Sequence, residues 1–143
     1  MSKDVSDSAR IRFSIASDLG EVRCAAESIR DFLAKSGCAA SDISDCELAL
    51  VEACNNAILN APPEPQQRVE IEAQCGTHAI ELRITDHTHG FEWPEKAVLP
   101  KVDSENGRGL FLIQSVMNTT KYERNLTGNT LMLQKLRSNS AAQ

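Results

Sequence analysis

The feature that most constrains the fold is one long amphipathic stretch, DCELALVEACNNAILNA, at residues 45–61. Its apolar residues recur at helical spacing and form one stripe, which comprises Ile43, Cys46, Leu50, Cys54, Ala57, Ile58 and Ala61. The two prolines at 62–63 disfavour helical geometry before them, and Ser41 or Asp42 can open a helix. The sequence therefore predicts a helix that lies on a core and ends near Asn60.

Glu52 and Asn56 stand four residues apart in this stretch. On a helix of 3.6 residues per turn they are offset by roughly 40°, so both project from one face, opposite the apolar stripe. A carboxylate beside a carboxamide can take a proton and hold a metal ion. Asn60 continues the same strip by one turn. Any amphipathic helix has polar residues on its outer face, so this helix alone leaves both interpretations open.

Hydrophobic periodicity predicts the other elements. Period-two alternation indicates strands, helical spacing indicates helices, and periodicity disappears between Asp86 and Gly109. A segment of that length without structure is typical of a functional loop or lid. In order we expect a strand at 10–15, a helix that starts at about Leu19 and is stopped by Gly37, and the central helix. A hairpin at 68–75 and 79–85, the loop, a helix at 110–117, and a hairpin at 121–124 and 130–136 follow.

This order of elements predicts an α/β (α+β) two-layer sandwich, with a mixed, mainly antiparallel sheet and helices on one face. A chain of 143 residues, 41% of them hydrophobic, suits one domain. We expect that domain to span residues 10–137, with polar tails at 1–9 and 138–143.

Charge and cysteine content indicate which classes of partner the protein can bind and in which cellular compartment it functions. The net charge is −5, with Lys and Arg scattered, so nothing indicates binding to nucleic acid or to a membrane surface. The five cysteines form no C-x-x-C pair and are odd in number, which indicates buried thiols in a reducing compartment. The first residues lack the apolar core of a signal peptide, and no apolar run could span a membrane. We therefore expect a cytoplasmic protein.

Three further groups of residues could carry chemistry. Asp86 ends a strand and Gly90 follows, so the acid could accept an amino group while the glycine admits a ring close to the backbone. Residues 106–109, Asn-Gly-Arg-Gly, precede the helix predicted at Leu110, where backbone N–H groups can bind an anion. Gly-Asn-Thr at 128–130 enters the last strand. Taken singly, each group is also a plain turn signal.

The histidines give a weak indication of a metal site. His87 and His89 are two residues apart in the loop, and His78 is nearby in sequence. A structural zinc site needs four ligands, and the cysteines are not placed to complete one. We therefore expect no zinc site here.

Together, the order and spacing of these groups are more specific than any one of them. A helix with Glu-x-x-x-Asn, a strand ending in Asp-x-x-x-Gly, Gly-x-Gly into a helix and Gly-x-Thr into a last strand resemble the Bergerat-type ATP-binding fold of histidine kinases and DNA gyrase. Within that superfamily, the short length and the phrases VEACNNAILNA and GRGLFLIQSVMN resemble the anti-sigma-factor serine-protein kinases, small bacterial switch proteins. The resemblance covers about residues 10–136.

The resemblance implies a role for each matched residue. Asn56 would be the ligand of Mg²⁺, and Glu52 would be the general base that takes the proton from the hydroxyl being phosphorylated. Asp86 would receive the adenine amino group, Gly90 would let the base lie flat, and Thr130 would support Asp86. The remaining matches would contribute to the ATP site: Asn60 beside Asn56, and Gly107, Arg108, Gly109 and Leu110 around the phosphates, with residues 97–106 as a lid.

The implied function is that of an anti-sigma factor with serine kinase activity. Such a protein binds Mg·ATP, sequesters a sigma factor as a homodimer, and phosphorylates a serine of its anti-sigma-factor antagonist, a cycle called partner switching. Thr88 departs from the family pattern, because it stands where the first glycine of Asp-x-Gly-x-Gly is expected. Two alternatives are an ATP-binding anti-sigma module without kinase activity and a detached ATP-binding domain of a histidine kinase.

Overall fold

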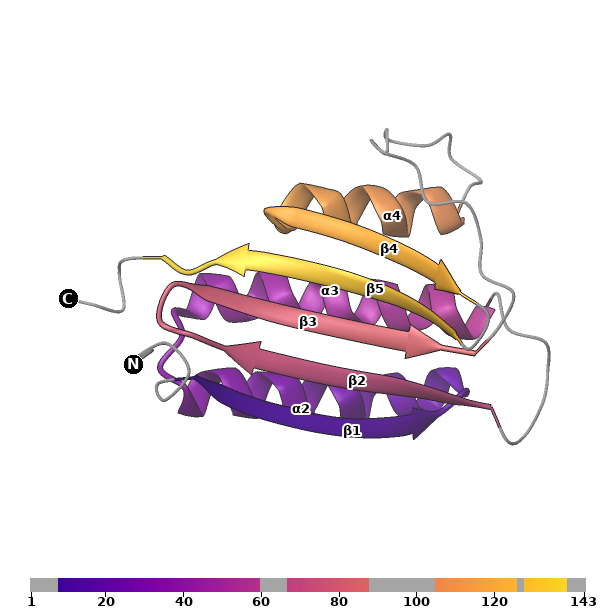
Figure 1. The fold of residues 1–143 in the computed structure, drawn as a ribbon, viewed down its shortest axis with the longest axis horizontal. Helices are drawn as coiled ribbons and strands as arrows, with labels where there is room; N and C mark the ends of the chain where they lie inside the picture. The colour runs from indigo at the N-terminus through magenta and orange to yellow at the C-terminus, as the bar shows by residue number, and fades with distance from the viewer. Residues whose placement is uncertain (1–7, 60–66, 88–104, 126–127, 139–143) are drawn as a thin grey trace.

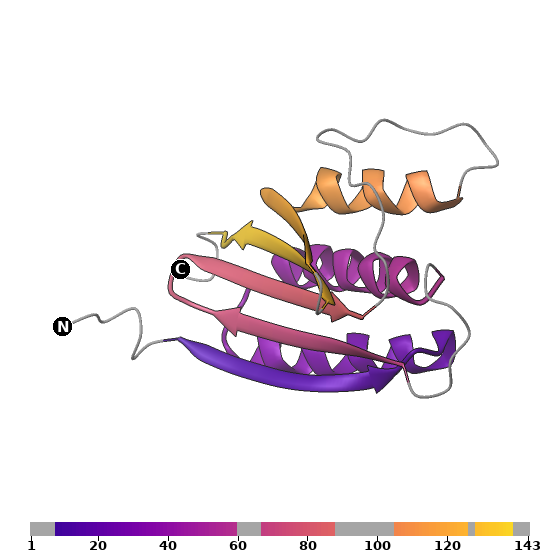
Figure 2. The same ribbon diagram turned by 45° about the vertical axis from the view of Figure 1, so that its right-hand side comes forward.

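In the computed structural model, one five-stranded antiparallel sheet with strand order β1-β2-β3-β5-β4 forms one layer and the helices form the other (Figure 1). The structure describes residues 8–59, 67–87, 105–125 and 128–138. The helices cover one face of the sheet and leave the other face open, as the turned view in Figure 2 also shows. The predicted two-layer class with helices on one face is confirmed, and in the described residues every strand pair is antiparallel.

The observed elements follow the predicted order closely. The hairpin strand predicted at 68–75 has those bounds, and most other elements differ by a few residues at their ends. The elements are β1 (Ala9–Ala16), a 3₁₀ turn η1 (Leu19–Glu21), α2 (Val22–Lys35), α3 (Ala40–Leu59), β2 (Arg68–Cys75), β3 (Ala79–Asp86), α4 (Glu105–Val116), β4 (Thr119–Asn125) and β5 (Gly128–Leu136). No helix of these described segments is long and apolar enough to cross a membrane.

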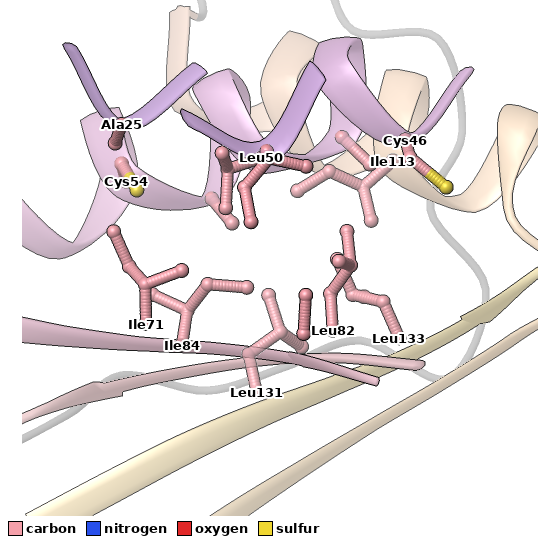
Figure 3. Packing of buried hydrophobic residues seen from close by; sticks show 14 of the residues in the cluster. Ala25, Cys46, Leu50, Cys54, Ile71, Leu82, Ile84, Ile113, Leu131 and Leu133 are labelled. Atoms are coloured by element: carbon pink, nitrogen blue, oxygen red, sulfur yellow. The ribbon is translucent and has the colours of Figure 1, made fainter. Parts of the chain in front are cut away.

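The core lies between α3 and the middle of the sheet. The apolar stripe of α3 is buried at Cys46, Leu50 and Cys54, as the helical spacing predicts. Figure 3 shows these side chains on the helical side of the core, opposite inward-facing residues of the sheet such as Ile71, Leu82 and Leu133. Burying an aliphatic side chain of this size stabilises the fold by about 1.5–3 kcal/mol, so the seam between α3 and the sheet fixes the position of α3.

Helix α4 begins earlier than the sequence predicts. We expected a turn at 106–109 and a helix from Leu110, whereas the helix starts at Glu105 and includes Gly107 and Gly109. That prediction was wrong because glycine lowers helix propensity by only about 1 kcal/mol relative to alanine, which tertiary packing offsets. Ile113 of α4 is fully buried in the core cluster, so α4 is held on α3 by packing.

The C-terminal strand is fastened to the start of α3. Asp42, predicted as a capping residue, lies inside α3 and is buried. Its carboxylate accepts hydrogen bonds from the backbone N–H of Ser138 at 2.7 Å and from the Ser138 hydroxyl at 2.9 Å. Lys135 forms an ion pair with Asp45 at 2.7 Å. Ser138 was predicted to begin a tail and is instead held, while residues 1–7 and 139–143 lie outside the described residues.

We expect Asp42→Ala to lower the free energy of unfolding by about 1–3 kcal/mol, because it leaves two donors of Ser138 without their buried acceptor. The measurement is urea denaturation followed by circular dichroism. Asp31→Ala, at an exposed position of α2, is the matched control and should cost less than about 0.5 kcal/mol. Equal losses for both variants would show that the contact with Ser138 contributes nothing.

Candidate active site

The acid and the amide singled out in the sequence lie on the side of α3 that α4 covers. Asn56 is buried, with 6% of its surface exposed, and Glu52 is half-buried. We predicted that both would lie on an outer face. That part of the prediction was wrong because α3 is the central helix, packed between α2 and α4. The acid and the amide therefore lie where α4 packs on α3, and they are partly shielded from water there.

Gly109 allows α4 to approach the acid and the amide closely. A Cβ atom at this position would lie 2.9 Å from Oε1 of Glu52 and 3.5 Å from both Oδ1 and Nδ2 of Asn56. A separation of 2.9 Å is shorter than real Cβ atoms tolerate. The absence of a side chain at Gly109 therefore brings the backbone of α4 against the carboxylate and the carboxamide together.

The start of α4, one turn before Gly109, provides hydrogen-bond donors. The first four N–H groups of an α-helix have no partner within the helix, and the helix dipole adds a favourable field for anions. These residues are 105–108 in α4, so they include Gly107 and Arg108 of the predicted phosphate turn. Arg108 is exposed and Leu110 is buried. Of the anion-binding residues predicted for a turn before the helix, 106–108 thus belong to its first turn, and Gly109 follows that turn.

Asp86 ends β3 with its side chain facing the helical layer. It is 6% exposed, and Oδ1 accepts a hydrogen bond of 3.0 Å from Nδ2 of Asn129, which is 1% exposed. Gly128 lets β5 come this close, since a Cβ there would lie 2.9 Å from the backbone oxygen of Asp86. A buried carboxylate oriented by an amide is suited to accept a hydrogen bond from an amino group.

Thr130 does not support Asp86, which corrects the sequence-based prediction. Its hydroxyl lies 3.0 Å from that of Thr85, its partner in the β3–β5 register. Side chains alternate between faces along a strand, so Thr85 and Thr130 lie on the open face while Asp86 and Asn129 point inward. The sequence reasoning missed Asn129. Counting back in steps of two from the buried Leu131 and Leu133 would have identified it.

A small cavity connects the amide to the aspartate. Its lining comprises Ala53, Asn56, Ala57, Ile84, Asp86, Tyr122 and Leu131. The wall is mostly apolar, with one carboxylate and one carboxamide, which is the composition expected around a planar ring with a polar edge. The cavity measures about 10 Å³. That is the room of roughly one water molecule, so a nucleobase would require its walls to move apart.

Some predicted site residues cannot be placed. Asn60, Gly90 and most of the predicted lid at 97–106 lie outside the described residues. Of the histidines, His87 pairs with Glu70 at 3.0 Å through Nε2. No group of three or more His, Cys, Asp or Glu side chains in the described part of the chain could hold a metal ion. The structure thus brings Glu52, Asn56 and Gly109 together, and Asn56 lines one cavity with Asp86, the last residue of β3. The arrow of β3 points to the right in Figure 1.

We expect Gly109→Ala to weaken binding of a nucleoside triphosphate by about ten-fold, or about 1.4 kcal/mol, because its methyl group must displace Glu52 or the start of α4. Binding of adenosine, which has no phosphates, should change less. Isothermal titration calorimetry measures both. Gly20→Ala is the matched control, since its nearest contact of 3.5 Å is ordinary. Equal losses for the two ligands would mean that Gly109 is only structural.

A second pair of variants separates the structural assignment from the sequence-based one. We expect Asn129→Leu to weaken binding of ATP and adenosine alike by about ten-fold or more, because Asp86 loses a hydrogen bond from a buried donor. Thr130→Val removes a hydroxyl on the opposite face and should leave both affinities within about two-fold. A larger loss for the Thr130 variant would restore the original assignment.

Comparison with solved structures supports the fold. The chain is similar to a crystal structure of the RsbU and RsbW domains of Rv1364c from Mycobacterium tuberculosis, with a TM-score of 0.69 and 16% sequence identity over 91% of this chain. It spans only 33% of that longer protein. It is also similar to the histidine kinase AdeS of Acinetobacter baumannii, with a TM-score of 0.52 and 13% identity over 89% of this chain and 68% of that one.

Sequence comparison gives the family. No curated protein matches the chain. The model of the histidine kinase-like ATPase domain matches residues 15–135, which include every described residue of the candidate site. The acid–amide pair on α3, the close approach of α4 at Gly109 and the inward-facing Asp86 are thus set in a fold of known class, and the chain belongs to the histidine kinase-like ATPase domain family.

Proposed function

We propose that this chain is an ATP-dependent serine kinase that acts as an anti-sigma factor. The observation that carries the proposal is the meeting of Glu52 and Asn56 with the α4 backbone at Gly109. A carboxylate and a carboxamide beside the backbone of α4, one turn from the N-terminus of that helix, suit phosphoryl transfer, which depends on positioning and charge neutralisation. Because the chain belongs to the histidine kinase-like ATPase domain family, we propose ATP as the phosphoryl donor.

The residues present fit a bound magnesium ion. Mg²⁺ prefers oxygen ligands and is held by a few protein oxygens together with phosphates and water. Oδ1 of Asn56 is such an oxygen, and it lies 3.5 Å from where a Cβ of Gly109 would be, so the helix that would bind the phosphates is adjacent. When bound, the ion would neutralise the triphosphate charge. We assign Asn56 to hold it.

Glu52 is proposed as the general base. It lies one helical turn before Asn56 and is half-buried, with Oε1 next to the backbone of α4. A carboxylate there can accept the proton of a serine hydroxyl as the oxygen attacks the terminal phosphorus. The same group is not needed to bind the nucleotide. Loss of Glu52 should therefore affect transfer much more than binding.

The nucleobase and the phosphates would be held at two separate places. Asp86, oriented by Asn129, would accept the exocyclic amino group of adenine at the end of β3. The first turn of α4, with Gly107 and Arg108, would bind the phosphates through backbone N–H groups. Asn56 lines the cavity at Asp86 and also lies next to Gly109, so it connects the two places.

The partners are proposed from similarity. One of the similar structures contains an RsbW domain, and the sequence resembles anti-sigma-factor kinases. We infer that the chain forms a homodimer, holds a sigma factor, and phosphorylates a serine on an antagonist protein. A binding module that uses ATP only as a conformational ligand is the alternative. It would have the same fold and the same ATP site.

Transfer of labelled phosphate separates the two functions. We expect wild-type protein with Mg·ATP to produce phosphoserine on the antagonist, and Glu52→Gln to lower the rate by about 10²–10⁴-fold with ATP affinity within about three-fold of wild type. Asn56→Ala should abolish magnesium-dependent ATP binding. The readouts are phosphoamino-acid analysis and calorimetry with and without Mg²⁺.

Two neighbours on α3 provide matched controls. Glu47→Gln removes an acid that pairs with Arg30 outside the site, and Asn55→Ala removes the adjacent amide; both should retain transfer. Intact ATP binding without transfer in the wild-type protein would favour the module. Phosphohistidine in place of phosphoserine would favour the histidine-kinase alternative. Unchanged ATP affinity in Asn56→Ala would contradict the proposed site.

A further inference from the structure

We propose that Cys38 and Cys75 are a site of reversible disulfide modification. Their Sγ atoms lie 3.4 Å apart, although the residues are 37 positions apart in the chain. Cys38 follows the left-handed Gly37 in the connection from α2 to α3, and Cys75 is the last residue of β2. The contact therefore joins the helical layer to the sheet, and neither cysteine belongs to the candidate active site.

The backbone on both sides of the contact is held by one arginine. The guanidinium of Arg137 donates to the carbonyl oxygen of Gly76 at 2.8 Å and to that of Gly37 at 3.1 Å. Gly76 follows Cys75 and Gly37 precedes Cys38, so the two segments that carry the thiols are bridged by the same side chain. The thiols are thus held near each other by a contact other than their own.

The remaining movement is small. A disulfide requires about 2.05 Å between the sulfurs, so closure from 3.4 Å takes roughly 1.4 Å. Cys38 lies in the short connection between the end of α2 and the start of α3, and its side chain is only half-buried. Cys75 is fixed by pairing with Ile80 in the β2–β3 ladder. We expect Cys38 to make most of the movement.

The chemistry balances with a two-electron oxidant such as hydrogen peroxide. Cys38, half-buried, is the more accessible thiol, whereas Cys75 is 3% exposed. The Cys38 thiolate attacks one peroxide oxygen and becomes a sulfenic acid, and water leaves. Cys75 Sγ then attacks that sulfur, gives up its proton, and releases a second water molecule. Two thiols are oxidised to one disulfide, and one peroxide is reduced to two waters.

The environment makes this reaction slow and selective. Burial, together with the hydrogen bond to Cys75, raises the pKa of the Cys38 thiol to about 12, so the thiolate fraction is small at neutral pH. Burial also raises the pKa of Cys46 and of Cys54 to about 12. Of the five thiols, Cys38 and Cys75 are the pair whose sulfur atoms lie within 3.4 Å of each other. Sustained oxidation should therefore link this pair, while exposed Cys24 reacts without a neighbouring thiol.

The location predicts the consequence. Cys75 pairs with Ile80 near the start of β3, and Asp86 ends that strand, so the thiols and the candidate active site lie at opposite ends of the sheet. In Figure 1 the turn after β2 is at the left and the tip of β3 at the right. A cross-link that closes a loop of this length restricts the unfolded chain. It should raise Tm by about 10 °C and leave ATP affinity within about two-fold.

The test uses the reduced 143-residue chain treated with hydrogen peroxide or diamide. Free thiols are alkylated in denaturant, and the digest is analysed by mass spectrometry. We expect a peptide pair that links Cys38 to Cys75 within one chain, no covalent dimer, a mass lower by two hydrogen atoms per disulfide, a higher Tm, and full reversal by dithiothreitol. Cys38→Ser should abolish the linked pair and the rise in Tm.

The controls distinguish this site from general thiol oxidation. Cys24→Ser and Cys46→Ser should each retain the Cys38–Cys75 link. A link from Cys38 to Cys46, or links formed only between chains, would overturn the proposal. So would complete alkylation of Cys38 and Cys75 after Cys24 is fully oxidised. Because Cys38 is the less buried of the two, the Cys38 variant tests the proposal even if Cys75→Ser does not fold.

Discussion

The close approach of α4 to α3 at Gly109 is the contact on which the candidate active site depends. Without a side chain there, a carboxylate, a carboxamide and the backbone of α4 just after its first turn lie against one another. A single methyl group would lie 2.9 Å from Glu52 Oε1 and would have to displace it. The buried Ile113, one turn further along α4, holds the helix in that position. Core packing thus fixes the spacing between chemical groups that do not themselves contribute to the core.

On the sheet side of the site, strand register fixes which chemical groups lie next to each other. Side chains along a strand alternate between faces, so a shift of one residue moves a group to the opposite side of the sheet. Asp86 and Asn129 are register partners and face the helices, whereas Thr85 and Thr130, one position away, form their own hydrogen bond on the open face. The residue that supports Asp86 is therefore decided by register.

The two ends of the sheet differ in what they contribute. At one end are the acid, the amide and the inward-facing aspartate. At the other end, Arg137 bridges the turns that follow α2 and β2, and Asp42 holds Ser138. Hydrogen bonds that fasten the last strand to the helical layer are thus separated in space from the groups assigned to nucleotide chemistry. A stabilising change at the fastened end, such as the proposed disulfide, can leave the nucleotide site unaltered.

The sequence by itself determined the order of elements, the class of the fold and the family resemblance, because these depend on local periodicity and on the spacing of motifs. The strand at 68–75 and the buried stripe of α3 were predicted this way, and so were Glu52, Asn56 and Asp86 as the residues of interest. Only the tertiary structure decided that Asn56 is buried, that Gly107 and Gly109 lie within α4, that Asn129 supports Asp86, and that Ser138 is bonded to Asp42. Each of these depends on contacts between segments far apart in the chain, and local sequence patterns carry no information about such distances.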